Sequence, residues 1–218
     1  MDAHIVDHLT KLSFKQGIPQ AHVEYIKSIK DYGHEPKVIY DIGSCVLYWT
    51  NMAKKFWPQS EYILFDAFNE AEFLYKDYKY HIGVLGDIDN KEIKWYQNNY
   101  YPGGNSYYKE NNDQIFPENN FSYRKMSTLD TIVKKYNFPK PDLIKMDVQG
   151  CEIDIIKGGL ETIKHAKHLI IELQSVDYNR DAPKAVSSIP FIESLGFRLI
   201  TPLFCNNGPD GDYHFERL

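Results

Sequence analysis

Short apolar segments that end in an acid recur along this chain, and segments with helical periodicity separate them. The first three are "KVIYDIG" (37–43), "EYILFD" (61–66) and "YKYHIGVLGD" (78–87). Between the first two, apolar residues recur at helical spacing, at positions 46, 49, 52, 53 and 56. Strands that alternate with helices in this way are typical of a parallel sheet with helices on both faces.

The rest of the chain extends this pattern. A capping motif formed by Ser127 and Asp130 predicts the start of a helix that runs to Tyr136. We expect the remaining strands at 91–97, 121–127, 142–146 and 168–174, and further helices at 69–77, 153–163 and 190–195. The last two segments, "FRLITPL" and "GDYHFERL", are typical of an antiparallel pair. The predicted fold class is therefore α/β, with a mostly parallel central sheet and an antiparallel C-terminal strand pair.

The domain organisation follows from length and composition. The chain has 218 residues, which suits one domain with a full core. Residues 1–35 are polar with helical spacing and are predicted to be a helical flank, and residues 36–218 a single domain. An inserted loop at about 95–120 is rich in tyrosine and asparagine, and a loop of that length favours a lid or a binding loop over simple filler, with a disordered segment as the alternative.

Charge, hydropathy and cysteine content exclude several classes of protein. The net charge is −5 with no long basic run, which argues against a dedicated nucleic-acid binder. No apolar run approaches the roughly 20 residues that a bilayer-spanning helix needs, and the first residues hold no apolar signal core. The three cysteines are far apart in the sequence, as in reduced cytosolic proteins. We therefore expect a cytoplasmic protein without a membrane segment.

Acids mark the ends of the five predicted core strands. They are Asp41, Asp66, Asp87, Asp147 and Glu172. In open α/β sheets, ligands bind beyond the C-terminal ends of the strands. Single acids there are commonly helix caps, but five at one edge indicate a shared ligand site.

The first loop indicates the class of ligand. It reads "DIGSCVLYW" and lacks the second glycine that a pyrophosphate-binding loop requires. An acid two residues before Gly43 would repel pyrophosphate and suits an ammonium or a sulfonium instead. Asp66 ends the second strand, where an acid accepts hydrogen bonds from both ribose hydroxyls. Ammonium, ribose and sulfonium together describe S-adenosylmethionine.

Four motifs then resemble the FkbM family of S-adenosylmethionine-dependent methyltransferases. The most specific is "IKMDVQGCEIDIIKG" (144–158), and "STLDTIV", "GGNSYY" and "GDYHF" resemble three further family segments. The resemblance covers the chain from about Val38 to the C-terminus. It implies a class I, Rossmann-like methyltransferase fold and methyl transfer to a hydroxyl of a glycan or natural product; we favour a sugar.

The sequence departs from the family pattern at three places. The first family loop usually reads D-x-G-A-N-x-G, and here Cys45 and Leu47 replace the Asn and the second Gly. Gln149 stands where the family usually has Glu, so we assign no catalytic role to it. In the second strand, "FDA" replaces the usual "FEP", which makes the acid one methylene shorter.

Each predicted cofactor-binding residue has a plainer alternative. Gly43 and Ser44 would let the backbone approach the amino-acid end of the cofactor, and Asp41 would hold its ammonium through water or backbone. Alternatively they form an ordinary turn and a helix cap. Asp66, with Ala67 beside it, would bind the ribose, unless Asp66 is a solvated surface acid. The predicted adenine contacts are Leu85, Gly86 and Asp87, of which Asp87 could instead be a turn residue.

Asp147 is the predicted catalytic base or orienting group, and it would also face the cofactor methyl. Lys145 lies on the same face of its strand and could pair with Asp147 or bind an anionic acceptor. Glu172 is expected to contact the acceptor. Asp147, Glu152 and Glu172 could alternatively ligate a divalent metal, although we predict no metal site. Glu152 is also placed at a helix start, where the helix dipole favours a carboxylate.

The remaining predictions concern the acceptor. Tyrosines and asparagines of the inserted loop suit a sugar, and we expect Ser106, Tyr107 and Glu152 near it; the same loop could instead form a homodimer contact. His214 is either a surface histidine or a proton shuttle. Two alternative functions stay open: an RNA ribose methyltransferase, and a non-catalytic protein that binds cofactor or glycan.

Overall fold

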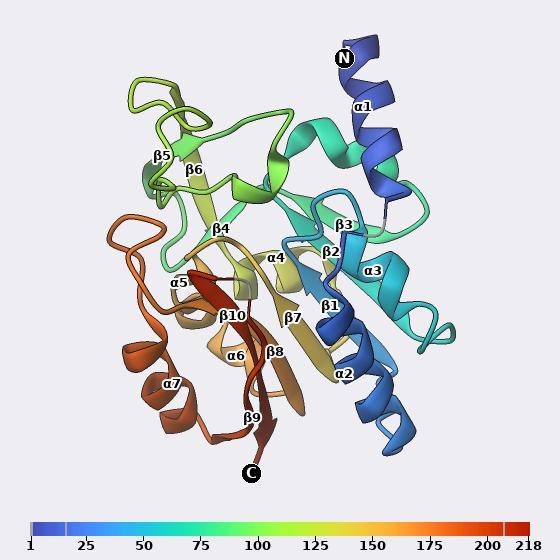
Figure 1. The fold of residues 1–218 in the computed structure, drawn as a ribbon. Coiled ribbons are helices and arrows are strands. Elements are labelled where there is room, and N and C mark those ends of the chain that lie inside the picture. The colour runs from blue at the N-terminus through green and yellow to red at the C-terminus, as the bar shows by residue number, and fades with distance from the viewer. Residues whose placement is uncertain (1, 16, 207) are drawn as a thin grey trace.

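The computed structural model describes residues 2–15, 17–206 and 208–218, so Met1 and Gln16 of the predicted flank, and Asn207, lie outside the described residues. A seven-stranded sheet runs in the order β3-β2-β1-β7-β8-β10-β9 (Figure 1). Its parallel strands are β1 Val38–Ile42, β2 Glu61–Asp66, β3 Lys79–Ile82, β7 Leu143–Met146 and β8 His168–Gln174. β9 Phe197–Asn206 and β10 Asp210–Arg217 form the antiparallel pair, with β10 next to β8. The predicted α/β, Rossmann-like fold class is confirmed.

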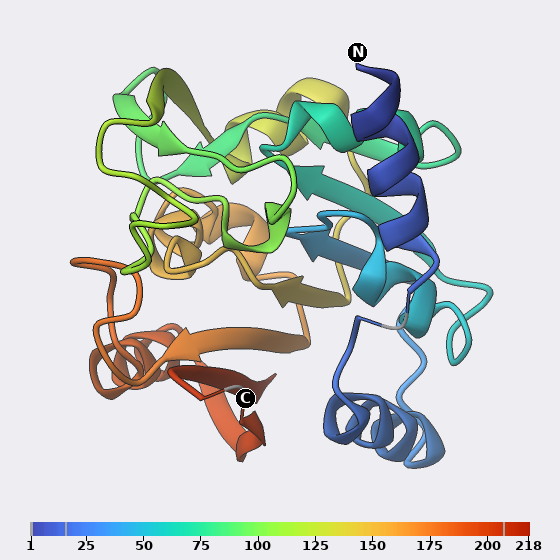
Figure 2. The same cartoon turned by 45° about the horizontal axis from the view of Figure 1, so that its top comes forward.

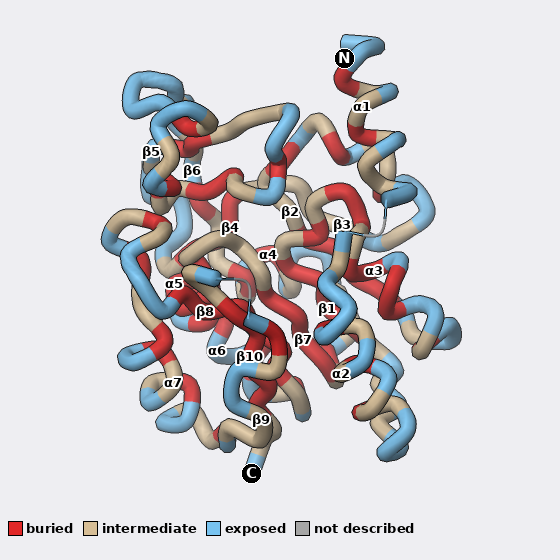
Figure 3. The backbone as a smooth tube through the Cα atoms, viewed as in Figure 1, coloured by how far each residue is buried: buried red, intermediate tan, exposed pale blue. Residues whose placement is uncertain are grey.

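Helices cover both faces of this sheet. One face carries α1 Ala3–Ser13, α2 Gln20–Asp31 and α3 Tyr48–Ala53, and the other carries α4 Leu129–Tyr136, α5 Glu152–Lys157, α6 Leu160–Ile163 and α7 Ala185–Ser194. Side chains alternate along each strand, so Ile39 packs toward α1–α3 while Tyr40 packs toward the other face. In Figure 3 the central strands are buried and exposure is concentrated on loops and outer helix surfaces.

A second, three-stranded sheet has the order β4-β6-β5, with β4 Val84–Gly86, β5 Glu92–Tyr96 and β6 Phe121–Thr128. The predicted strand at 78–87 is therefore divided between two sheets. The division falls at Gly83, whose amide donates to the Asp66 carbonyl at 2.8 Å. Two short 3-10 helices, η1 Asn69–Leu74 and η2 Pro102–Gly104, complete the elements.

Several predicted helices begin or end elsewhere. The helix predicted at 153–163 is broken into α5 and α6 at Gly158 and Gly159, where Gly159 leaves the helical conformation with φ −127. Gly158 also packs closely on β4, since a Cβ there would lie 2.1 Å from the Gly86 carbonyl oxygen. The cap of α4 is Thr128, one residue later than predicted, and its hydroxyl accepts a hydrogen bond from the Thr131 amide. η1 replaces the helix predicted at 69–77.

The parallel strands all point to one side of the molecule. In Figure 2 the arrowheads of β1, β2, β7 and β8 face the green segment that includes the predicted tyrosine-rich loop. β10 runs in the opposite direction, so its first residues lie at the same edge of the sheet. Within the described part of the chain, no helix has both the length and the apolar character required to cross a bilayer.

Candidate active site

A cavity of about 390 Å³ lies at this edge of the sheet. Its walls come from the ends of β1, β2, β7 and β8, from the start of β10, from the segment between α1 and α2, and from the tyrosine-rich loop. The predicted site residues that line it are Gly43, Ser44, Asp66, Ala67, Leu85, Tyr107, Lys145, Asp147 and Glu172. The structure thus brings together most of the residues that the sequence nominated.

The loop after β1 has a backbone that few residues tolerate. Gly43 has φ +86, and a Cβ at this position would lie 1.9 Å from the Asp147 carbonyl oxygen. Cys45 (φ 48) and Leu47 (φ 70) are also left-handed, a conformation that Asn and Gly adopt more readily than other residues. These are the two positions where the family pattern has Asn and Gly. Cys45 and Leu47 therefore adopt a conformation that Asn and Gly would adopt more readily.

Asp66 holds this loop against β2. Its Oδ2 accepts a hydrogen bond from the Cys45 amide at 2.6 Å, and its Oδ1 accepts one from the Phe68 amide at 2.7 Å. Burial raises the pKa of Asp66 to about 6, although both amide hydrogen bonds act in the opposite direction. Each carboxylate oxygen has a second lone pair, so two backbone contacts leave Asp66 able to accept hydrogen bonds from a ligand.

Lys145 joins two carboxylates. Its Nζ lies 3.5 Å from Asp41 Oδ1 and 3.4 Å from Asp147 Oδ2, and it donates to the Gly43 carbonyl at 3.3 Å. Burial alone would lower the pKa of Lys145, but Asp147 and Asp41 outweigh it and the pKa is raised. The predicted pairing with Asp147 is present, and the register also sets Lys145 directly beside Asp41.

Asp41 is fully buried behind Lys145. Its Oδ2 accepts a hydrogen bond from the Thr50 hydroxyl at 2.5 Å. These contacts make it a counter-ion of Lys145, in a different position from the cofactor-ammonium site that the sequence predicts. A carboxylate here fixes the ammonium of Lys145 beneath Asp147.

Gln149 links the two acids at the centre of the cavity. Its Nε2 donates to Asp147 Oδ1 at 3.0 Å and to Glu172 Oε2 at 3.0 Å. Burial acts to raise the pKa of both acids, but the Lys145 ammonium overrides it at Asp147, whose pKa is lowered. The pKa of Glu172 is raised well above its usual value by burial and by Asp147. These opposite shifts favour a pair with the carboxylate on Asp147 and the proton on Glu172.

Two predicted acceptor residues brace the Asp147–Gly150 turn. Glu152 Oε1 accepts from the Val148 amide at 2.9 Å and from the Gly150 amide at 3.3 Å. Ser106 donates from its hydroxyl to the Gln149 carbonyl at 2.9 Å. Glu152 is thus engaged by the backbone of its own loop.

The predicted adenine contacts are divided. Leu85 lines the cavity, whereas Gly86 packs against the Met126 side chain and Gly158. Asp87 forms an ion pair with Lys91 at 3.2 Å, which agrees with the alternative that it is a turn residue.

The expectation that His214 is a surface residue is wrong. β10 lies between β8 and β9, and His214 is fully buried. Its Nδ1 is 2.8 Å from the Tyr25 hydroxyl, and its Nε2 is 3.2 Å from His168 Nδ1. It therefore links the sheet to α2 within the protein interior.

Sequence reasoning missed two parts of the cavity wall. Asp210 and Asp212 line it from the start of β10, where an antiparallel strand brings its N-terminal end to the edge formed by parallel C-terminal ends. The "DGD" pattern before the closing strand was the available signal.

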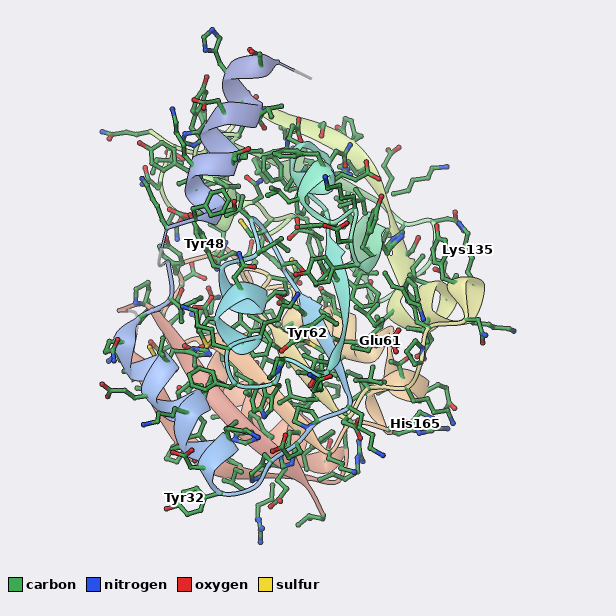
Figure 4. All side chains as sticks on the ribbon, turned by 90° about the vertical axis from the view of Figure 1, so that its right-hand side faces the viewer. Tyr32, Tyr48, Glu61, Tyr62, Lys135 and His165 are labelled. Carbon is green, nitrogen blue, oxygen red and sulfur yellow. The ribbon has the colours of Figure 1, made fainter. Side chains whose placement is uncertain are left out.

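The second missed part comes from the predicted N-terminal flank. Gly17, Ile18, Pro19 and His22 also line the cavity. The flank lies against Tyr48 at the start of α3, and Tyr48 Cδ1 would be 2.7 Å from a Cβ on Gly17 (Figure 4). The flank is thus part of the site wall.

His22 ties this flank to β10. Its Nδ1 lies 2.9 Å from Asp212 Oδ2, and its Nε2 accepts a hydrogen bond from Trp49 Nε1 at 3.0 Å. His22, Asp212 and Cys205 offer ligand atoms within 4.8 Å of one another. However, Trp49 and Asp212 already use both ring nitrogens, with the ring proton on Nδ1, so the arrangement fits a hydrogen-bonded link better than a metal centre.

Comparisons with known proteins identify the family and the fold. A sequence model described as the methyltransferase FkbM domain matches residues 41–199, well over half of the chain. The fold is similar to that of precorrin-6y C5,15-methyltransferase from Geobacter metallireducens GS-15, at 12% identity and a TM-score of 0.52, over 94% of this chain and 92% of that one.

A second similar structure is an O-methyltransferase family protein from Burkholderia thailandensis. The identity is 7% and the TM-score 0.50, and the alignment covers 89% of this chain but 55% of that one. A search of curated protein sequences found no significant match.

Proposed function

This chain belongs to the FkbM family of methyltransferases, and we propose that it methylates a hydroxyl oxygen of a sugar or a related small molecule, using S-adenosylmethionine. The observation that carries the proposal is the placement of Asp66 and Asp147 in one cavity. They end β2 and β7, on either side of β1 and its tight glycine loop. Asp66 would bind the ribose and Asp147 the reacting hydroxyl. The loop after β1, on which the amino-acid end of the cofactor would rest, lies between them.

The residues present fit this cofactor. Gly43 lets the loop after β1 pack against the Asp147 carbonyl, where a Cβ would lie 1.9 Å from the oxygen, and the loop lines the cavity. Asp66 is oriented by two amides and faces the cavity. Leu85 and Trp95 supply apolar wall near Ala67 for an adenine ring. Bound here, S-adenosylmethionine would supply an electrophilic methyl group on a sulfonium.

Asp147 would orient the acceptor. Methyl transfer requires the acceptor oxygen to lie in line with the methyl carbon and the sulfur. As the C–O bond forms, the C–S bond breaks with its electron pair on sulfur. The acceptor hydroxyl becomes strongly acidic in the same step, so a carboxylate with a lowered pKa is still able to take its proton. Lys145 keeps Asp147 ionised for this purpose.

The cavity wall also supports a sugar more than an RNA acceptor. Tyr107 and Tyr178 line it and offer aromatic faces to a sugar ring. Among the described lining residues there are five acids, and Lys145 is the one lysine or arginine. A phosphate backbone needs the opposite charge.

Formation of S-adenosylhomocysteine from S-adenosylmethionine, with a panel of sugars, tests the proposal. We expect turnover by the native protein, a large loss in Asp147→Asn, and no change in Asp177→Asn, which alters an exposed acid. Cofactor binding without turnover on any sugar would favour the non-catalytic alternative. A fully active Asp147→Asn variant would remove Asp147 from its role.

A further inference from the structure

Acids form a row across the sheet. Asp147 follows β7, Glu172 lies in the next strand, and Asp212 is the direct partner of Glu172 in β10. Asp210, two residues before Asp212, shares its face. Directly opposed residues on neighbouring strands have Cβ atoms about 5 Å apart, so these carboxyl groups meet in one part of the cavity.

This row extends beyond the place that the cofactor would occupy. From Asp66 on β2, the strands in order are β1, β7, β8 and β10. At about 4.8 Å per strand, β10 lies roughly 19 Å from β2. With its ribose at Asp66 and its amino-acid end over Gly43, the cofactor ends near β7. Asp210 and Asp212 therefore face the acceptor half of the cavity.

Among the described residues, the wall of the acceptor half carries more negative than positive charge. Lys145 is already shared between Asp41 and Asp147. His22 donates to Asp212 with the proton that its neutral ring carries, so it adds no formal charge. Burial, together with Asp147 and Asp212, raises the pKa of Asp210 to about 6. A cation placed here would relieve this repulsion.

An independent observation shows that the cavity is built for a polar ligand. Asn105 lines it and is 9% exposed, and among the described residues its Nδ2 has no hydrogen-bond partner. Its Oδ1 accepts from the Asn98 amide at 2.7 Å, which fixes the orientation of the side-chain amide. A buried donor without a partner is costly, so a ligand oxygen is the expected partner.

We propose that the acceptor is an amino sugar, whose ammonium group is held by Asp210 and Asp212 while Asn105 donates to one of its oxygens. This inference rests on the proposed function and specifies its substrate class. The ammonium serves for recognition, and the methyl group goes to a hydroxyl that Asp147 orients. Tyr178, beside these acids in the cavity wall, adds an aromatic face.

Binding of methyl glucosaminide, compared with its N-acetylated counterpart, tests the inference. The acetyl form keeps the sugar ring and lacks the charge. By calorimetry at neutral pH on the protein saturated with S-adenosylhomocysteine, we expect the amino form to bind tighter by about tenfold or more. Asp210→Asn should remove most of that preference and leave the affinity for S-adenosylhomocysteine within about twofold. Glu193→Gln, which alters an exposed acid on α7, is the matched control.

Three results of the binding measurements would overturn the inference. They are equal affinity for the two sugars, no measurable binding of the amino form, and a loss of cofactor affinity in Asp210→Asn, which would assign the acid to the cofactor instead. Failure of the broader proposal looks different, because then no sugar, neutral or charged, yields S-adenosylhomocysteine. Methylation of neutral sugars at equal efficiency would reject the amino-sugar class alone.

Discussion

Gln149 donates a hydrogen bond from its side-chain amide to Glu172 at 3.0 Å, and the same nitrogen reaches Asp147. An amide donates to both acids, whereas the glutamate usual at this position in the family would add a third carboxyl group. The two hydrogen bonds of the Gln149 amide therefore fit a site in which Asp147 is ionised and Glu172 is protonated.

Replacing Gln149 with glutamate should lower turnover at pH 7.5 by about tenfold, roughly 1.4 kcal/mol in the activation barrier. An ionised carboxylate at this position cannot donate to Asp147, and it repels the Asp147 carboxylate. Activity should recover as the pH falls, because a protonated carboxyl group donates as the amide does. Steady-state rates between pH 6 and 8 provide the measurement. Gln149→Ala, which has no group to protonate, should show no recovery, and a similar recovery there would contradict this explanation.

Gly43→Ala should greatly destabilise the protein and abolish cofactor binding. The new Cβ would lie 1.9 Å from the Asp147 carbonyl oxygen, and the residue would also keep a φ of +86. Gly33 is a matched control, since its φ is +91 but no atom lies within 4 Å of its Cβ position. We expect about 1 kcal/mol of lost stability in Gly33→Ala, from the backbone conformation alone, and several-fold more in Gly43→Ala. Chemical denaturation would measure the loss of unfolding free energy in each variant. Equal losses would show that the close approach of Gly43 to the Asp147 carbonyl does not affect stability.

Asp66→Asn should weaken the binding of S-adenosylmethionine by about tenfold or more, because a carboxylate accepts stronger hydrogen bonds from ribose than an amide does. Burial raises the pKa of Asp66 to about 6, so its ionised fraction grows as the pH rises through that value. Native affinity should therefore increase between pH 5 and 7, and the variant should lack this increase. Calorimetric titrations at several pH values would measure it. Asp87→Asn provides a comparison, since Asp87 pairs with Lys91 and is expected to change affinity little.

Lys145→Met should destabilise the protein by about 3–5 kcal/mol, since Asp41 would remain buried without its counter-ion. Adding Asp41→Asn to this variant should restore part of the stability, because it removes the isolated charge. Urea denaturation of the native protein, both single variants and the double variant completes the cycle. If the stability losses of the two single variants add up to that of the double variant, Lys145 and Asp41 do not interact.

The mostly parallel sheet, and the meeting of predicted residues such as Asp66, Asp147 and Glu172 in one cavity, followed from the sequence because strand ends in a parallel sheet lie at one edge. Asp210 and Asp212 were missed because that rule considers only C-terminal ends, and β10 is antiparallel. His22 was missed because its role depends on contacts with Trp49 and Asp212, which are distant in sequence. Asp41 could be placed on its strand, but its burial behind Lys145 depends on the register between β1 and β7.

A chain of three histidines, of which His214 is fully buried, joins α2 to the sheet and gives the last prediction. Tyr25 donates to the Thr201 hydroxyl at 2.7 Å, so its oxygen accepts from His214 Nδ1 at 2.8 Å. The chain continues through His168 to His34, with distances of 3.2 and 3.0 Å between ring nitrogens. Each ring donates from Nδ1, so a second ring proton on His168 or His214 would place two N–H groups head to head.

His214→Gln should therefore cost stability at pH 7.5 and progressively less at lower pH. Burial, with His168 and His34 nearby, lowers the pKa of His214 to about 3, against an ordinary value of 6.5. The unfolded chain binds this proton first, so the stability contributed by the neutral ring is present above pH 6.5 and is lost as the pH falls toward 3. The difference in unfolding free energy between native protein and variant should shrink by up to about 1.4 kcal/mol per pH unit in this window. The native protein must be compared with the variant, because Asp66 and Asp210 have raised pKa values and add stability as the pH falls. This contribution is the same in both proteins and cancels in the difference. If the difference in unfolding free energy between native protein and variant stays constant from about pH 7.5 to 5, the neutral histidine chain does not hold α2 in place.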